Sequence, residues 1–180
     1  DTIREVHGYA KQAAAYGYSK VFGLNAMVAV VSTPLTAPVI VASALRRGNT
    51  ASGKGSARML TRAAATARQA GVSGRLMGRA DSAFYRHDLV TAMIKAKMWF
   101  SVTARKNTAV KTAITRIPEQ AWVPIKYPNA VWEADDTVPG GGYWVSDAEV
   151  AETSFVAFSS KKKAQQVPCR LVVRRVRRLQ

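Results

Sequence analysis

Cysteine and long apolar runs are nearly missing from this sequence of 180 residues. The single cysteine, Cys169, excludes an internal disulfide and any metal site built from several cysteines, and it suits a reducing cytoplasm. The longest apolar run, residues 26–31, has the length of a strand, whereas a helix that spans a membrane needs ~18 residues. No signal-peptide pattern is present. We therefore expect a cytoplasmic protein without a membrane partner.

Acidic residues are scarce as well. The chain carries 27 Lys and Arg against 11 Asp and Glu, which gives a formal net charge of +16 and a pI near 10.6. From Val6 to Ala80 there is no Asp or Glu, although that interval holds ten Lys and Arg. This excess favours a polyanion as partner, above all nucleic acid. The apolar share of 48% excludes wholesale disorder, and the length suits one ordinary domain with a small appendage.

One acid is conspicuous against this basic background. Asp81 follows a short apolar run around Leu76 and Met77, which is too brief for a stable helix and is predicted to be a buried strand. A carboxylate at the end of such a strand is well placed to hold a metal ion against a phosphate group. The alternative is structural, with Asp81 or Ser82 starting the helix that follows. The local sequence leaves both interpretations open.

The hydrophobic pattern predicts an α/β fold. Strands are expected at residues 2–6, 21–32, 39–45, 75–81 and 99–105, and helices at 56–70, 86–97 and 107–117. The second helix has Leu89, Val90, Met93 and Ile94 at core spacing, and Asn107 can cap the third. Strand–helix–strand units require parallel pairing with a crossover, so the sheet is mixed. Three meandering strands followed by two crossover strands are the layout of the ribonuclease H-like fold, in which the first and fourth strands are central neighbours.

The composition changes at Glu119. Seven of the eleven acids lie between Glu119 and Glu152, together with three of the four tryptophans and three consecutive glycines. Short β-type pieces are predicted at residues 122–127, 143–146, 153–158 and 170–176. We therefore divide the chain into a core, residues 1–118, and a β-rich subdomain, residues 119–180.

Two sets of basic residues are candidates for nucleic-acid contact. Arg58 and Arg62 lie four residues apart on the outer side of the first predicted helix, and Lys161, Lys162 and Lys163 follow a predicted β piece. Each set either contacts a phosphate backbone or forms a solvated face, and charge at a strand edge also prevents aggregation. The sequence Gly53-Lys-Gly-Ser56 lacks the spacing of a P-loop and is rejected as a nucleotide-binding loop.

Several motifs resemble bacterial insertion-sequence transposases of the DDE superfamily, group one. They are Asp1-Thr2, Gly17-Tyr-Ser19, Gly23-Leu-Asn-Ala-Met27, Arg79-Ala-Asp-Ser-Ala-Phe-Tyr85, Val145-Ser-Asp-Ala-Glu-Val-Ala-Glu152 and Ser159-Ser-Lys-Lys-Lys163. The resemblance covers essentially the whole chain and is most specific at Arg79–Tyr85. It implies a ribonuclease H-like catalytic core with a β-rich insertion, which cleaves and joins double-stranded DNA at the transposon ends and the target. It also implies a homodimer when the site is complete.

The resemblance further implies a catalytic site. Asp81 matches the second catalytic acid of the family, and Asp1 matches either the first acid or the residue that follows it. Both would be ligands of a pair of Mg²⁺ ions, for which Mn²⁺ can substitute, because Mg²⁺ prefers hard oxygen ligands. The third acid of the family, a Glu on a helix beyond the insertion, has no match, and Glu149 and Glu152 are poor substitutes. We therefore expect the chain to be a fragment that does not cut or join DNA alone.

A non-enzymatic, basic nucleic-acid-binding protein is the competing hypothesis. Composition alone favours it, whereas Asp81 and the motifs favour the transposase. Divalent-metal binding that disappears in Asp81→Asn distinguishes the two.

Overall fold

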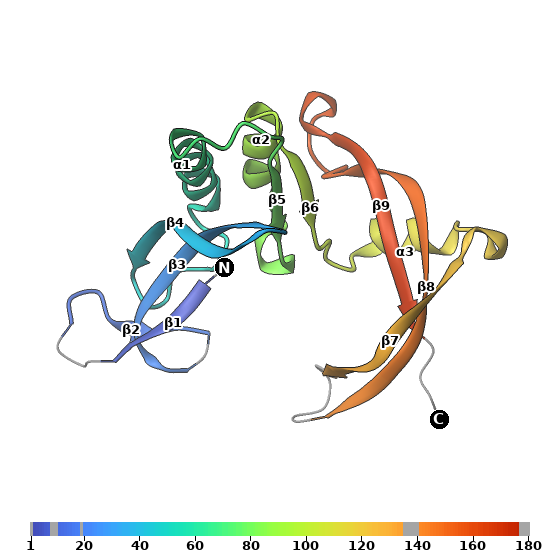
Figure 1. Cartoon of the computed structure of the whole chain (residues 1–180), viewed down its shortest axis with the longest axis horizontal. Helices are drawn as coiled ribbons and strands as arrows, with labels where there is room; N and C mark the ends of the chain where they lie inside the picture. Colours follow the sequence, from blue (N-terminus) through green and yellow to red (C-terminus); the bar gives the residue numbers. More distant parts are fainter. Residues whose placement is uncertain (1, 8–10, 19, 135–140, 177–180) are drawn as a thin grey trace. The chain divides into compact units, whose positions relative to one another are not determined.

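A computed structural model describes residues 2–7, 11–18, 20–134 and 141–176 of the chain (Figure 1). The chain forms two compact units, Asp1–Arg105 and Lys106–Gln180. Both units contain helical and strand segments, so the predicted α/β class is confirmed at this level.

An antiparallel sheet forms the first half of the first unit. Its longest strand, β3 (Phe22–Thr33), pairs with β1 (Thr2–His7), β2 (Ala15–Tyr16) and β4 (Thr36–Arg46). The predicted meander of β1, β3 and β4 is confirmed, while the two-residue β2 lies between the strands predicted at 2–6 and 21–32, where no strand was expected.

Pro38 lies inside β4, just before the strand predicted at residues 39–45. The ladder pairs Val31 with Val39 and Thr33 with Thr36, and its register shifts between these two pairs. Pro38 therefore falls within an irregularity of the ladder, which is where a strand tolerates a residue that lacks an N–H donor.

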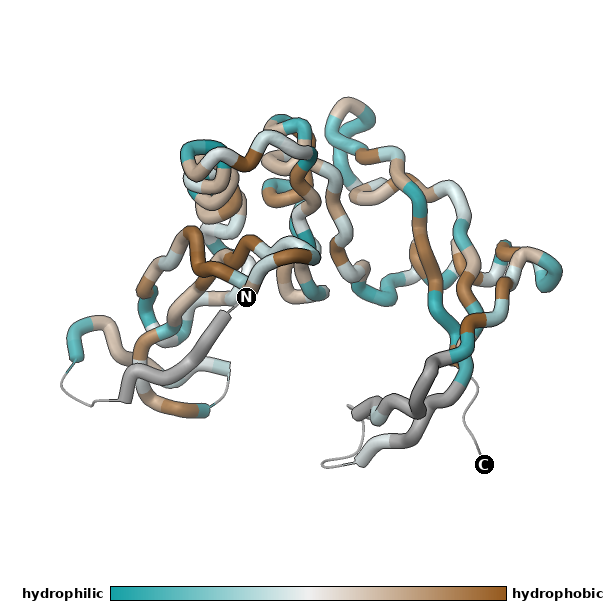
Figure 2. Tube along the Cα trace, viewed as in Figure 1, coloured by the Kyte–Doolittle hydropathy of each residue, from teal (hydrophilic) through white to brown (hydrophobic). Residues whose placement is uncertain are grey.

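Two helices build the core on this sheet. α1 (Ser56–Gln69) packs on β3, β4 and α2 (His87–Lys95), and α2 also packs on β6 (Trp99–Val102). The buried cluster joins both helices to the sheet, and Figure 2 shows hydrophobic residues along β3 and β4. The buried members of this cluster are Met27, Ala42, Met59, Ala63, Phe84, Leu89 and Met93. The predicted apolar faces of both helices are therefore largely confirmed, because spacing of three and four residues places these side chains on one side.

Two burial predictions were wrong. Ile94 is 46% exposed, because Leu89, Val90 and Met93 already fill the inward side of this short helix. β5 (Met77–Ala80) is a strand, as predicted, but it is not buried throughout, since Met77 is 47% exposed and Gly78 is buried. Successive side chains of a strand point to opposite faces, so β5 has one buried and one open face.

The predicted pairing of the first strand with the strand that ends at Asp81 is not found among the described residues. β1 pairs with β3, whereas β5 pairs in parallel with β6 in a separate two-stranded sheet. Antiparallel and parallel pairing both occur, as predicted, but in different sheets. β5 and β6 have only four residues each, so their ladder is short, and packing against α2 contributes to their position.

The second unit is a three-stranded antiparallel sheet preceded by a helix. The strands β7 (Val123–Ala134), β8 (Gly142–Ala157) and β9 (Val167–Val176) pair in chain order. Two of the predicted short pieces, 143–146 and 153–158, belong to the single long strand β8. The helix α3 (Thr108–Thr115) has Asn107 as its predicted cap, whose Oδ1 accepts from Val110 N at 3.0 Å. Since α3 contacts β8, the unit begins at Lys106 rather than at residue 119.

Arg175 links three elements of the second unit. Its guanidinium pairs with Glu149 on β8 and with Glu119 in the 3₁₀ helix η2 (Glu119–Ala121), and it lies 4.2 Å from the ring centroid of Trp122. Hydrogen bonds from the two carboxylates raise the pKa of Arg175 above its ordinary value. The arginine therefore connects β9 to β8 and η2 through charge and ring stacking.

Gly48→Ala is expected to destabilise the first unit by about 3 kcal/mol, the upper end of the usual cost of overpacking. A Cβ at residue 48 would lie 1.9 Å from the carbonyl oxygen of Gly23 and 2.3 Å from that of Ala15, and these backbone atoms cannot move aside alone. Urea unfolding followed by circular dichroism measures the change. Gly74→Ala is the matched control, since its Cβ would meet nothing within 4 Å. Equal midpoints for the two variants would contradict the close packing.

Candidate functional site

Asp81 lies where β5 ends and the 3₁₀ helix η1 (Ser82–Phe84) begins. Its side chain is exposed, and its Oδ1 accepts a hydrogen bond from Ala83 N at 2.8 Å. Asp81 is thus the N-cap of η1, as one interpretation of the sequence proposed. A carboxylate has two oxygens, however, and within the described residues Oδ2 has no hydrogen-bond partner. The cap and a role as ligand are therefore compatible.

The backbone around Asp81 is fixed from several sides. β6 pairs along the whole of β5, and Thr103 N donates to Ala80 O at 3.1 Å. Arg105 Nε donates to Ser82 O at 3.1 Å, and the buried ring of Phe84 anchors η1 in the core. Such support reduces the conformational freedom of the Asp81 carboxylate. A metal ligand or a catalytic group requires a fixed position of this kind.

The loop before α1 packs directly against η1. A Cβ at Gly53 would lie 2.8 Å from the carbonyl oxygen of Ala83 and 2.5 Å from Cδ of Arg86. Only a glycine permits this approach without displacing one of the two turns. The loop that carries Lys54 and the turn that carries Asp81 are therefore in contact.

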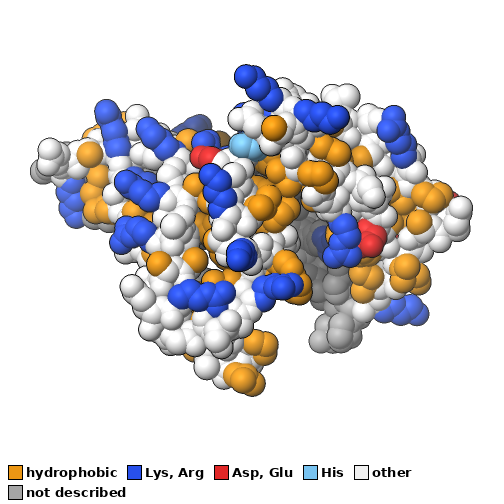
Figure 3. Space-filling view, turned by 90° about the horizontal axis from the view of Figure 1, so that it is seen from above, with side chains coloured by type: hydrophobic (Ala, Val, Ile, Leu, Met, Phe, Trp, Pro, Cys, Tyr) orange, Lys and Arg blue, Asp and Glu red, His pale blue; other side chains and the backbone are white. Residues whose placement is uncertain are grey.

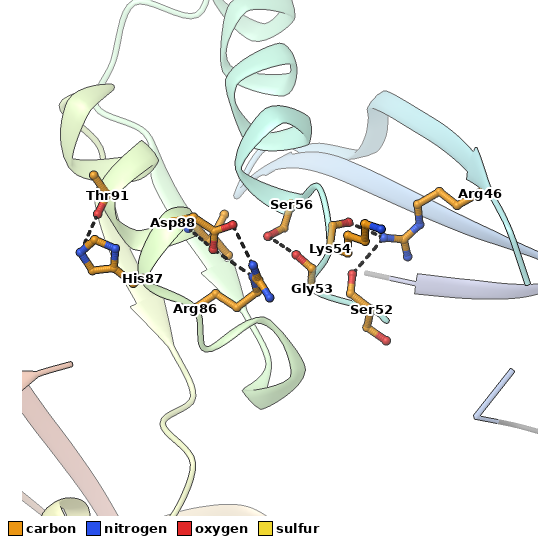
Figure 4. A network of polar contacts seen from close by, with 10 residues as sticks. Arg46, Ser52, Gly53, Lys54, Ser56, Arg86, His87, Asp88 and Thr91 are labelled. Carbon is orange, nitrogen blue, oxygen red and sulfur yellow. Dashed lines mark hydrogen bonds and ion pairs between the residues drawn. The ribbon is translucent and has the colours of Figure 1, made fainter. Parts of the chain in front are cut away.

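The donors near Asp81 fit a divalent metal only in part. Its oxygens are the hard ligands that Mg²⁺ prefers, yet the described residues contain no group of three or more His, Cys, Asp and Glu side chains that could hold a metal ion. Asp88 binds Arg86 through two hydrogen bonds of 2.9 and 3.0 Å, which lower the pKa of Asp88 (Figure 4). Asp1 lies outside the described residues. The described residues thus supply one candidate ligand, Asp81, and no complete centre.

Arg58 and Arg62 lie on the exposed side of α1, as predicted. Neither side chain has a hydrogen bond or an ion pair within the described residues. Both line a pocket of about 260 Å³ at the start of the helix, together with Lys54 and Arg46. In the space-filling view, Lys and Arg side chains are widely spread and acidic side chains are few (Figure 3). Arg58 and Arg62 are therefore available to an anionic partner.

Lys161, Lys162 and Lys163 lie in the exposed connection between β8 and β9, which includes the 3₁₀ helix η3 (Lys163–Gln165). Their ammonium groups have no hydrogen bond or ion pair in the part of the chain that the structure describes. The arginines of β9 differ, since Arg170 pairs with Glu152 at 2.9 Å and Arg175 pairs with two glutamates. The lysines are therefore better candidates for phosphate contact than these two arginines.

Comparison with known proteins decides the family. Residues 1–178 match the family described as transposase DDE domain, group 1. The chain belongs to this family. No curated protein matches the chain. Membership indicates a transposase domain, with DNA as partner and a divalent metal ion as the cofactor that such enzymes generally use.

Arg46 and Lys54 of this DDE domain escaped the sequence analysis as candidate contacts. Lys54 lies between two glycines before a helix, which is its local signal, although the segment does not match the P-loop pattern. Arg46 carried no local signal, because its partner Asn25 lies 21 residues earlier on β3. Burial lowers the pKa of Arg46 from its ordinary value, since a partly desolvated guanidinium loses hydration.

No helix in the described part of the DDE domain is both long enough and apolar enough to span a bilayer.

Proposed function

We propose that this DDE domain carries out metal-dependent cleavage and strand transfer of DNA, with Asp81 as a metal ligand. The observation that carries the proposal is the position of Asp81. Its carboxylate is exposed at the end of a paired strand, is held by η1 through one oxygen, and has the other oxygen without a hydrogen-bond partner among the described residues. A fixed carboxylate with one such oxygen, on a chain of net charge +16, suits a cation held against phosphate.

The reaction is attack by a water or 3′-hydroxyl oxygen on phosphorus, with departure of the opposite oxygen. Two bound Mg²⁺ ions, or Mn²⁺ in their place, would activate the attacking oxygen and stabilise the leaving one. The chain's own contribution is to present the oxygens of Asp81 at a fixed position and to bind phosphates through its cations. The proposal keeps Asp1 as the first acid or its neighbour in a ribonuclease H-like core. The family match supports this part of the proposal, and the strand pairing does not, since β1 pairs with β3 and β5 pairs with β6.

Double-stranded DNA, both transposon ends and target, is the proposed substrate. Arg58 and Arg62 on one unit and Lys161, Lys162 and Lys163 on the other are the proposed backbone contacts. Contacts of this kind are non-specific, because phosphate carries no sequence information. Cleavage at two transposon ends suits a homodimer.

A second candidate is a domain that binds nucleic acid without catalysing a reaction on it. The observation that favours it is the lack, within the described residues, of a group of three possible metal ligands. Unpaired cations such as Arg58 serve this function equally well, so metal binding is the property that separates the candidates.

Mn²⁺ binding by the chain is expected to weaken at least about 10-fold in Asp81→Asn, since even residues that only support metal ligands contribute 10–100-fold to affinity. Asparagine keeps an oxygen that can accept from Ala83 N, so the cap and the fold should persist. The measurement is the electron paramagnetic resonance signal of free Mn²⁺ during titration.

The matched control is Asp147→Asn, which removes the same charge from an exposed position of β8. Its Mn²⁺ affinity should equal that of the unmodified chain. Equal affinities for all three proteins would favour the non-catalytic candidate.

A further inference from the structure

The pocket at the start of α1 has an unusual lining. Four of its residues are cationic, namely Arg46, Lys54, Arg58 and Arg62, and none is acidic. Its floor includes Met27 and Met59, which are 3% and 5% exposed and belong to the hydrophobic core. A hollow of about 260 Å³ with a cationic rim and an apolar floor is chemically suited to an anion.

Three of the four cations at this rim are not neutralised by the described parts of the chain. The side chains of Lys54, Arg58 and Arg62 have no hydrogen bond or ion pair among the described residues. Arg58 and Arg62 are one helical turn apart, a spacing at which like charges repel. An anion bound between them would remove this repulsion, so the arrangement is less favourable empty than occupied.

Arg46 positions the loop that carries Lys54. Its Nη1 donates to Lys54 O at 2.7 Å and to Ser52 O at 3.1 Å (Figure 4). Its Nε donates to Asn25 Oδ1 at 2.9 Å. Asn25 is buried in β3, with 4% of its surface exposed. The backbone at Lys54 is thereby tied to the sheet rather than left as a free loop, which lowers the entropy lost when its ammonium group binds a ligand.

The chemistry of the rim favours phosphate over a single carboxylate. Guanidinium groups offer paired donors that match the oxygens of phosphate, and an ammonium group adds a compact third charge. The apolar floor excludes water on one side, and electrostatic attraction is stronger where water is excluded. A tetrahedral anion can accept from several of these groups at once.

We propose that this pocket is a discrete site for one backbone phosphate of the DNA strand that the domain binds. The inference rests on the proposed DNA-binding function and adds to it a fixed contact point. Lys54, Arg58 and Arg62 contact the phosphate, and Arg46 is a positioning residue. Binding at a discrete site differs from attraction to a diffuse basic surface, because the members of the site act on the same phosphate.

The test compares Lys54→Gln, Arg58→Gln, Arg62→Gln and the triple variant in binding to duplex DNA, measured by fluorescence anisotropy at several salt concentrations. Gln preserves helix propensity in α1. If the three residues share one phosphate, the triple variant should lower the slope of log K against log salt by about 0.9, the value for one phosphate, rather than by about three times that amount. The losses of DNA-binding free energy in the three single variants should also add up to more than the loss in the triple variant.

The control is a triple variant with the same loss of charge, Lys95→Gln, Lys106→Gln and Lys111→Gln, whose side chains are exposed and lie outside the pocket. Identical slopes and affinities for the two triple variants would overturn the inference and leave general DNA binding intact. Failure of the unmodified chain to bind DNA in a salt-dependent way would instead overturn the proposed function.

Inorganic phosphate serves as a second probe. It should raise the thermal midpoint of the unmodified chain and of the control triple variant, but not that of the pocket triple variant. If the pocket variant loses this stabilisation yet binds DNA as the control does, the pocket holds free phosphate, and the assignment to DNA is wrong.

Discussion

In a transposase that carries this domain together with its third acid, Asp81→Asn is expected to reduce Mg²⁺-dependent cleavage of DNA about 10³-fold or more. The removal of one preorganised group that stabilises charge already costs about 10²–10³ in rate, and a metal ligand acts on the ions that would perform this stabilisation. Asparagine retains an acceptor for Ala83 N, so the loss should not arise from unfolding. Nicking of supercoiled plasmid in Mg²⁺ and in Mn²⁺ is the measurement.

Asp147→Asn is again the control and should cleave normally. Full cleavage by Asp81→Asn would transfer the role to another carboxylate. Glu149 and Glu152 are poor substitutes on structural grounds, because Glu149 pairs with Arg175 at 2.7 Å and Glu152 pairs with Arg170 at 2.9 Å.

DNA affinity is expected to fall by about 10³–10⁵ between roughly 50 and 200 mM salt, if six to ten phosphates are contacted. The physical reason is the release of counterions from the duplex by the unpaired cations of both units. Duplexes of unrelated sequence should behave alike, since the proposed contacts reach the backbone and not the bases. A salt series with two unrelated duplexes measures both properties.

Replacement of Lys161, Lys162 and Lys163 together by Gln should reduce this slope. Arg170→Gln should change it less, because Arg170 is engaged by Glu152. An unchanged slope in the lysine variant would assign these residues to a solvated connection. Salt-insensitive or strongly sequence-selective binding would contradict a surface that contacts the backbone.

The helices could be predicted well from the sequence, because their signals are local. Met59, Ala63 and Ala67 are buried at intervals of four, and Asn107 caps α3 as its position before an apolar face indicated. The strands were also located, and the meander of β1, β3 and β4 was predicted correctly, but the predicted pairing of β1 with β5 is not found among the described residues. The strand with which β5 pairs is decided by contacts between segments that are distant in the sequence. A strand of four residues has too short a hydrophobic pattern to specify those contacts.

The candidate site was predictable only in its local parts. Asp81 at the end of a strand and Arg58 and Arg62 on an outer helical face follow from spacing. The pocket does not, since it requires Arg46 to bind both Asn25 on the neighbouring strand and the backbone of Lys54. The unit boundary at Lys106 likewise depends on the packing of α3 against β8, which no composition change marks.

The approach of Gly53 to Ala83 and Arg86 has a mechanical consequence. Not even a methyl group fits between the backbone of the loop that carries Lys54 and that of the η1 turn, so neither can move toward the other. Asp81 is hydrogen-bonded to Ala83, and Lys54 follows Gly53 in the chain. The distance between the Asp81 turn and the Lys54 loop is therefore fixed by direct backbone packing. It does not depend on side-chain rotamers, which could adjust.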